Sequence, residues 1–135
     1  MSHVRSTSVL IVEDVPLMGE VVTVVAKKAG FTDVDQVSGG LAALKRMHEK
    51  NYGLVISDLE MDDMNGVELL QAVRQDARLK RTPFIMITAY RKSKHIIAAR
   101  DADVDSVLIK PFTPTQLREK IELIWARAEA AAAGH

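Results

Sequence analysis

The chain alternates short apolar runs with longer segments in which apolar residues recur every three or four positions. Four runs are continuous, and polar or charged residues follow each of them directly: 9–12, 54–56, 84–87 and 107–109. Continuous apolar runs of this length are typical of strands buried on both faces, as in a parallel sheet covered by helices. A fifth run, at 34–37, alternates apolar and polar residues and predicts an edge strand.

Helical periodicity fills the segments between and after these runs. The clearest apolar stripes lie in the first and last of them: Met18, Val21, Val22 and Val25, and then Leu117, Ile121, Ile124, Trp125 and Ala128. Shorter stripes mark three further helices: Leu41, Leu44 and Met47; Val67, Leu70 and Val73; and Ile96 with Ala99. Strand and helix therefore alternate five times, which predicts a doubly wound α/β sheet with helices on both faces. We expect Trp125 to pack in the core.

Length and composition narrow the class of protein. The 135 residues suit one domain, and 47% hydrophobic residues are enough to form its core. Eighteen Lys and Arg residues balance eighteen Asp and Glu residues, and this zero net charge argues against wholesale binding to nucleic acid or an anionic membrane. The absence of cysteine excludes disulfides, zinc–thiolate sites and a cysteine nucleophile. No apolar stretch approaches the roughly 18 residues of a membrane helix and none resembles a signal peptide, so we expect a cytoplasmic protein.

Polar side chains that can bind a ligand or take part in a reaction follow four of the predicted strands. Glu13 and Asp14 come after the first strand, Asp58 after the third, Thr88 after the fourth and Lys110 after the fifth. Ligands of open parallel sheets bind outside the carboxyl ends of the strands. The sequence therefore predicts that these five side chains meet at one edge of the sheet.

The chemistry of this set points to phosphoryl transfer. Three neighbouring carboxylates repel one another, and a hard divalent cation such as Mg²⁺ relieves that repulsion through oxygen ligands. A lysine ammonium neutralises a phosphoryl oxygen as a point charge, and a threonine hydroxyl donates one hydrogen bond. An aspartate in such a setting can act as a nucleophile and form an acyl phosphate.

Taken together, these motifs resemble the receiver domain of two-component response regulators. The resemblance rests on Glu13-Asp14, Asp58, Thr88-Ala89 and Lys110-Pro111-Phe112, in this order and spacing. It covers about residues 8–128, with residues 1–7 and 129–135 expected to fray, and it is strongest to stand-alone receivers of the chemotaxis-regulator type. It implies a flavodoxin-like fold, with five helices around a sheet in the strand order 2-1-3-4-5.

The resemblance also implies roles for the residues at the strand ends. Asp58 is the expected phospho-acceptor, and it would receive the phosphoryl group from a histidine kinase or a histidine phosphotransfer protein. Lys110 is expected to contact the phosphoryl group, Thr88 to move toward it, and the Lys110–Pro111 peptide bond to be cis. No external substrate is implied; the expected chemistry is at most slow self-phosphorylation from small donors and self-dephosphorylation, so the protein is a switch and not an enzyme.

A bound Mg²⁺ is part of the same resemblance. Asp14 and Asp58 are expected to bind the ion directly, Glu60 through its backbone carbonyl, and Glu13 through a water molecule. These assignments come from the family pattern and not from the spacing of the residues.

Two residues depart from the family pattern, and two more occupy positions that vary within it. Asp62 stands where a proline is expected, which adds negative charge and backbone freedom beside the site. Val107 stands where the family has a switch aromatic, three residues before the lysine. Glu60 and Tyr90 occupy positions that tune the access of water to the acyl phosphate, so we expect an altered phosphoryl lifetime.

A basic cluster marks the fourth helix and the loop before it: Arg91, Lys92, Lys94, His95 and Arg100. The cluster lies at and along the fourth helix, and Val107 lies on the fifth strand. In the family, these two elements and the fifth helix form the usual output surface. One interpretation is a docking face for an acidic partner protein. The alternatives are a solvated helix face or, more rarely, an arginine-lined site for a cyclic dinucleotide. We expect a monomer or a weak dimer.

Other functions of the site stay open. Asp58 serves equally as an intermediate in a phosphorelay or as a phosphate sink. A small aspartate-nucleophile phosphatase is a further alternative, although Asp58-Leu59-Glu60 only loosely matches the Asp-x-Asp motif of that class and the chain has no cap for substrate choice. A receiver that binds partners without phosphorylation is disfavoured by the intact acceptor set.

Overall fold

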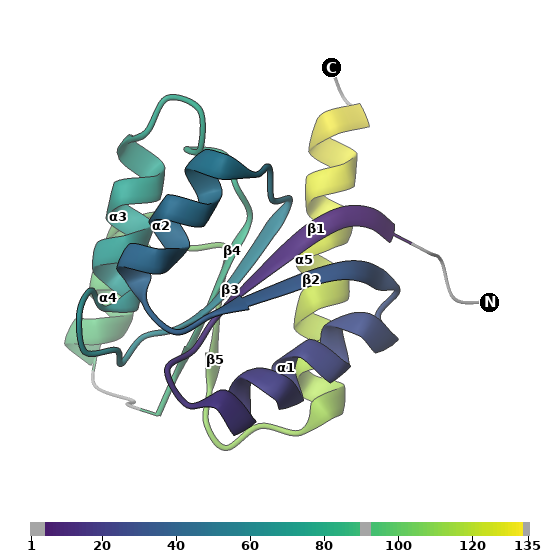
Figure 1. Ribbon diagram of the computed structural model, residues 1–135, viewed down its shortest axis with the longest axis horizontal. Coiled ribbons are helices and arrows are strands. Elements are labelled where there is room, and N and C mark those ends of the chain that lie inside the picture. The colour runs from purple at the N-terminus through teal and green to yellow at the C-terminus, as the bar shows by residue number, and fades with distance from the viewer. Residues whose placement is uncertain (1–4, 90–92, 134–135) are drawn as a thin grey trace.

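The computed structural model describes residues 5–89 and 93–133, and strand and helix alternate along this part of the chain (Figure 1). The elements are β1 (Arg5–Val12), α1 (Pro16–Lys28), β2 (Phe31–Val37), α2 (Gly40–Glu49), β3 (Leu54–Asp58), α3 (Gly66–Gln75), β4 (Phe84–Thr88), α4 (Ser93–Asp101), β5 (Ser106–Ile109) and α5 (Pro114–Ala133). None of the described helices is both long enough and apolar enough to cross a membrane.

The five strands form one parallel sheet in the order β2-β1-β3-β4-β5. This confirms the predicted doubly wound fold and the edge position of the alternating second strand. The register brings the strand ends level with one another, since Val12 pairs with Ser57, Asp58 with Ile87, and Thr88 with Ile109. The polar residues at or just after these positions therefore emerge at one edge of the sheet.

Both faces of the sheet are buried, which explains why the strand sequences are continuously apolar. Val9 and Ile11 of β1 pack with α1 and α5, whereas Leu10 and Val12 pack with α2, α3 and α4. Figure 1 shows the same division, with α1 and α5 on one side of the sheet and the other three helices on the opposite side. Trp125 packs against the first of these cores, its ring meeting that of Phe31 edge-on with centroids 5.3 Å apart. The prediction that Trp125 packs in the core is confirmed in part, because the side chain contacts the core but stays half-buried at its edge.

Local sequence explains where the helices begin. Asn65 and Glu68 form a capping box at the start of α3, in which each side chain accepts a hydrogen bond from the other residue's backbone N–H. Gly39 precedes α2 and offers no side chain, so the carboxylate of Asp63 accepts from the N–H groups of Gly40 and Leu41 instead, both at 3.3 Å. The loop that follows β3 is therefore tied to the N-terminus of α2.

β1 and α5 both extend beyond the apolar positions from which they were predicted. Residues 5–7 belong to β1, where the Arg5 N–H donates to the carbonyl of Gly30 at 2.7 Å, and α5 continues through residues 129–133. These residues therefore belong to regular elements, and fraying of the chain ends stays a prediction. Alanine has the highest intrinsic helix propensity, so the alanine-rich end continues the helix without needing an apolar stripe. Residues 1–4 and 134–135 lie outside the described part.

Candidate functional site

Three carboxylates meet at the carboxyl ends of β1 and β3. Glu13 and Asp14 follow β1, and Asp58 is the last residue of β3. Each contributes one carboxylate oxygen to a group whose members all lie within 4.8 Å of one another. Glu13 and Asp58 are almost fully buried, with 5% and 6% of their surfaces exposed. The convergence predicted for the three acids is confirmed.

Lys110 brings a positive charge to the same cluster. Its Nζ lies 3.3 Å from Oδ1 of Asp58 and 3.8 Å from Oε1 of Glu13. The residue follows β5, and its backbone N–H donates to the carbonyl of Thr88 at 2.8 Å. The Lys110–Pro111 peptide bond is cis, as the family resemblance implied.

Burial changes the acidity of the two inner carboxyls. The pKa of Asp58 is raised to about 7, first because the carboxyl is buried and then because Glu13 places a second negative charge beside it, while Lys110 acts in the opposite direction. Burial also raises the pKa of Glu13, although the Val15 N–H that donates to its carboxylate and the charge of Lys110 lower it in part. When the three carboxyls are ionised, they carry more negative charge than the single ammonium of Lys110 can compensate.

A divalent cation suits this arrangement. All three side chains offer carboxylate oxygens, the ligands that Mg²⁺ prefers. Burial raises the pKa of Glu13 and of Asp58, because it penalises negative charge that a bound cation would neutralise. The residues named for this role from the sequence are therefore together, apart from the backbone carbonyl of Glu60, whose part in metal binding stays a prediction.

Thr88 is buried at the end of β4, and its hydroxyl has a partner that sequence reasoning did not identify. Its Oγ1 donates to Oε1 of Glu60 at 2.8 Å, from β4 to the loop that follows β3. Glu60 also approaches Asp58 closely enough for its hydrogen bonding and charge to add to the rise in the pKa of Asp58. The family pattern singled out both Glu60 and Thr88, but neither the pattern nor the spacing of 28 residues indicated that they bond to each other.

The residues predicted for the partner surface lie apart from this cluster. Lys94 and Arg100 are exposed on α4, and His95 is half-buried there. Val107 is half-buried in β5 and packs against the core beneath α4. Tyr90, Arg91 and Lys92 lie outside the described residues.

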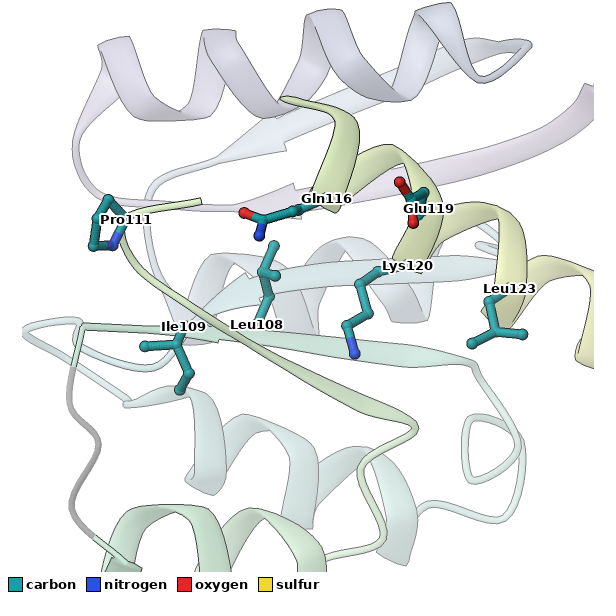
Figure 2. A pocket seen from close by; sticks show the side chains of 7 residues that line it. All are labelled: Leu108, Ile109, Pro111, Gln116, Glu119, Lys120 and Leu123. Carbon is teal, nitrogen blue, oxygen red and sulfur yellow. The ribbon is translucent and has the colours of Figure 1, made fainter. Parts of the chain in front are cut away.

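A hollow of about 580 Å³ opens between β5 and the first half of α5 (Figure 2). Apolar side chains and one charge of each sign line it: Leu108, Ile109, Pro111, Gln116, Glu119, Lys120 and Leu123. Leu123 is 48% exposed at this surface, which is high for a leucine. The hollow adjoins Lys110 through Pro111 but does not include the acidic cluster.

Comparison with known proteins decides the family. A profile of the response regulator receiver domain matches residues 9–122. The chain belongs to the response regulator receiver domain family. This receiver is 40% identical over 119 residues to the chemotaxis protein CheY of Pseudomonas aeruginosa, covering 88% of this chain and 96% of that protein. It is 35% identical over 123 residues to chemotaxis protein CheY-3 of Vibrio cholerae, covering 91% and 95%.

Solved structures agree with this membership. A crystal structure of a putative response regulator from Chloroflexus aurantiacus superposes with a TM-score of 0.84 at 29% identity, covering 90% of this receiver and 99% of that chain. The chemotaxis response regulator CheY4 of Vibrio cholerae gives a TM-score of 0.82 at 27% identity, covering 89% and 99%. The resemblance drawn from the strand-end motifs is confirmed, and with it the assignment to two-component signalling.

Proposed function

We propose that this receiver is a switch that accepts a phosphoryl group on Asp58 from the phosphohistidine of a histidine kinase or a histidine phosphotransfer protein. The observation that carries the proposal is the position of the Asp58 carboxylate, which is buried beside two further acids and 3.3 Å from the Lys110 ammonium. A carboxylate with a fixed cation on one side and oxygen ligands for a metal on the other is arranged for attack on phosphorus.

In the transfer step, a carboxylate oxygen of Asp58 attacks phosphorus in line with the phosphorus–nitrogen bond of phosphohistidine. The new phosphorus–oxygen bond forms as the phosphorus–nitrogen bond breaks, and its electron pair stays on the imidazole nitrogen, which takes up a proton. Lys110 and the Leu59 N–H, the latter 3.0 Å from Oδ1, hold the carboxylate in one orientation. Lys110 then stabilises negative charge on the transferred group.

The three acids are the proposed magnesium ligands, with Asp14 and Asp58 binding directly, Glu13 through water, and Glu60 through its backbone carbonyl. When bound, Mg²⁺ supplies positive charge that neutralises the acids and the phosphoryl oxygens. Neutralisation also favours the deprotonated form of Asp58, which is the form that attacks.

The proposed output is a change in the surface formed by α4, β5 and α5. A movement of Thr88 toward the phosphoryl group reaches β5 directly, because the carbonyl of Thr88 accepts the N–H of Lys110. The exposed bases Lys94 and Arg100, with the hollow between β5 and α5, suit a partner that carries acidic residues around an apolar anchor. Phosphorylation would shift an existing equilibrium between two forms of this surface.

Onward transfer in a phosphorelay uses the same residues and is compatible with the proposal. Turnover of an external substrate is not part of it, because the expected chemistry is self-phosphorylation from small donors and self-dephosphorylation. Hydrolysis of p-nitrophenyl phosphate well above the rate of an Asp58→Asn variant would instead support a small aspartate-nucleophile phosphatase.

Amide NMR spectra of the ¹⁵N-labelled protein test the switch. Acetyl phosphate with Mg²⁺ should shift the signals around Asp58 and, in the same titration, those of Lys94, Val107 and Lys120 on the proposed output surface. An Asp58→Asn variant treated identically should show neither change. Changes that stay within the acidic cluster, with the output surface unmoved, would contradict the proposed switch.

A further inference from the structure

Glu60 and Thr88 are joined by a hydrogen bond at the edge of the acceptor site. Thr88 is 1% exposed at the end of β4, and its Oγ1 lies 2.8 Å from Oε1 of Glu60, which is half-exposed in the loop after β3. The carboxylate offers only acceptor atoms, so the threonine hydroxyl must be the donor.

We infer that Glu60 acts as a latch, holding the hydroxyl proton of Thr88 in the unphosphorylated protein and competing for it with the phosphoryl group on Asp58. The inference rests on the proposed function, because it concerns what Thr88 must leave in order to reach an acyl phosphate. It makes Glu60 a positioning residue that sets how readily the receiver enters its phosphorylated form.

The competition follows from the single proton of a hydroxyl group. Thr88 can donate one hydrogen bond, and a bond to a carboxylate is stronger than one to a neutral acceptor. A hydroxyl held in this way cannot donate to a phosphoryl oxygen at the same time. The bond to Glu60 must therefore break when Thr88 contacts the phosphoryl group.

Charge makes the latch respond to phosphorylation. Glu60 already raises the pKa of Asp58 through its proximity, behind burial and the charge of Glu13. An acyl phosphate carries almost two negative charges where the carboxylate carries at most one, and it adds several strong acceptor oxygens. It repels the carboxylate of Glu60 while attracting the hydroxyl of Thr88, so the same event weakens one bond and forms the other.

A general effect of charge must be separated from the specific bond, because removing any acid near the site favours a bound anion. A double-mutant cycle makes this separation, with beryllium fluoride and Mg²⁺ as the phosphoryl analogue. The four proteins are the wild type, Glu60→Gln, Thr88→Val and the double variant. Valine keeps the shape of threonine and replaces its hydroxyl with a methyl group, and Asp62→Asn controls for loss of one exposed charge in the same loop.

The latch predicts that Glu60→Gln tightens beryllium fluoride binding about fivefold more in the wild-type background than in the Thr88→Val background. Asp62→Asn should change the affinity about twofold or less, equally in both backgrounds. Equal effects of Glu60→Gln in the two backgrounds would overturn the latch and leave the acceptor role of Asp58 intact. A wild type that binds no beryllium fluoride with Mg²⁺ present would overturn the proposed function and the latch with it.

The methyl group of Thr88 gives a second readout that needs no phosphoryl analogue. Selective ¹³C labelling should show that Glu60→Gln moves the Thr88 methyl signal or splits it between two positions in the metal-free protein, because the restraint is weakened. Asp62→Asn should leave this signal in place. An unchanged Thr88 signal in Glu60→Gln would contradict the latch, whatever the outcome of the binding measurements.

Discussion

Lys110 Nζ lies 3.3 Å from Asp58 Oδ1, although β3, which ends at Asp58, does not pair with β5, which Lys110 follows. β4 lies between β3 and β5, and the side chain of Lys110 crosses its end to reach the acid. The contact therefore depends on the whole register of the sheet from β3 to β5. It also gives Asp58 a compensating cation that no metal or partner has to supply.

Loss of this cation should make Asp58 a weaker acid. Lys110→Met keeps most of the length of the side chain and removes its charge, which is the contribution that lowers the pKa of Asp58. We expect the pKa of Asp58 to rise further above about 7 in the metal-free variant. A ¹³C-detected carboxyl titration measures the pKa of Asp58. Lys45 is exposed, so Lys45→Met serves as a control that should leave this pKa unchanged. A lowered or unchanged pKa in Lys110→Met would contradict the assigned contact.

Asp58→Asn should stabilise the metal-free protein in a pH-dependent way. The carboxyl has a pKa of about 7 in the folded state against 3.8 for an unperturbed aspartate, so the folded wild type binds more protons than the unfolded chain between these pH values. Stability of the wild type therefore falls as pH rises through this window, and the asparagine variant escapes that loss.

Each pKa unit corresponds to about 1.4 kcal/mol, and after solvent screening we expect the variant to be about 2 kcal/mol more stable at pH 8 but nearly equal at pH 4. Urea unfolding in EDTA measures the difference. Adding Mg²⁺ should stabilise the wild type more than the variant, because an ion that binds only the folded state raises its stability. A difference that is constant from pH 4 to pH 8 would show that the acidity of Asp58 is not its cause.

Gly66 should tolerate no side chain, because α3 begins directly against the acceptor strand. A Cβ at this position would lie 2.6 Å from the backbone carbonyl of Asp58 and 2.5 Å from Sδ of Met86. The methionine can move, but the backbone cannot move without shifting the acceptor itself. We expect Gly66→Ala to cost about 1 to 3 kcal/mol in urea unfolding.

The exposed Gln71→Ala on the same helix should stay within about 0.5 kcal/mol of the wild type. The Gly66→Ala variant should also shift the carboxyl signal of Asp58 in metal-free NMR spectra. A Gly66→Ala variant with the same free energy of unfolding as the wild type would contradict the close packing of α3 against β3.

Asp105 should be a structural acid at the opposite end of β4. Its Oδ2 accepts from the Phe84 N–H at 2.6 Å and from Nη2 of Arg74 at 3.0 Å, which fixes the start of β4 to α3. Asp105→Ala leaves the backbone N–H of a buried residue without its acceptor, so we expect a loss of about 2 kcal/mol. Asp101→Ala, which removes an exposed acid from α4, should have little effect in the same urea titration.

The hydrophobic pattern predicted the fold because burial on both faces leaves a strong signature in a strand. The apolar runs end where β1, β3 and β4 reach the edge of the sheet, so the residues that follow them could be assigned to one site. This reasoning placed Asp58 beside Glu13 and Lys110 without any contact information, since parallel strands share one carboxyl edge.

Contacts made by loops and helix ends could not be predicted in the same way. The bond from Thr88 to Glu60 depends on how the loop after β3 folds back, and a half-exposed glutamate has no sequence signal for its partner. The trans cap of α2 by Asp63 depends on the same loop. The ends of β1 and α5 were also placed too far inside the chain, because backbone pairing and alanine propensity extend elements beyond their apolar stripes.

The most direct test of the central claim is the intact mass of the protein after incubation with acetyl phosphate and Mg²⁺. We predict a gain equal to one phosphoryl group, mapped by peptide analysis to Asp58, lost on treatment with hydroxylamine, and absent from the Asp58→Asn variant. An Asp62→Asn control should still gain the group, because that acid lies outside the acceptor cluster. A wild-type mass that does not change, or a phosphoryl group mapped to any other residue, would contradict the assignment of Asp58 as the acceptor.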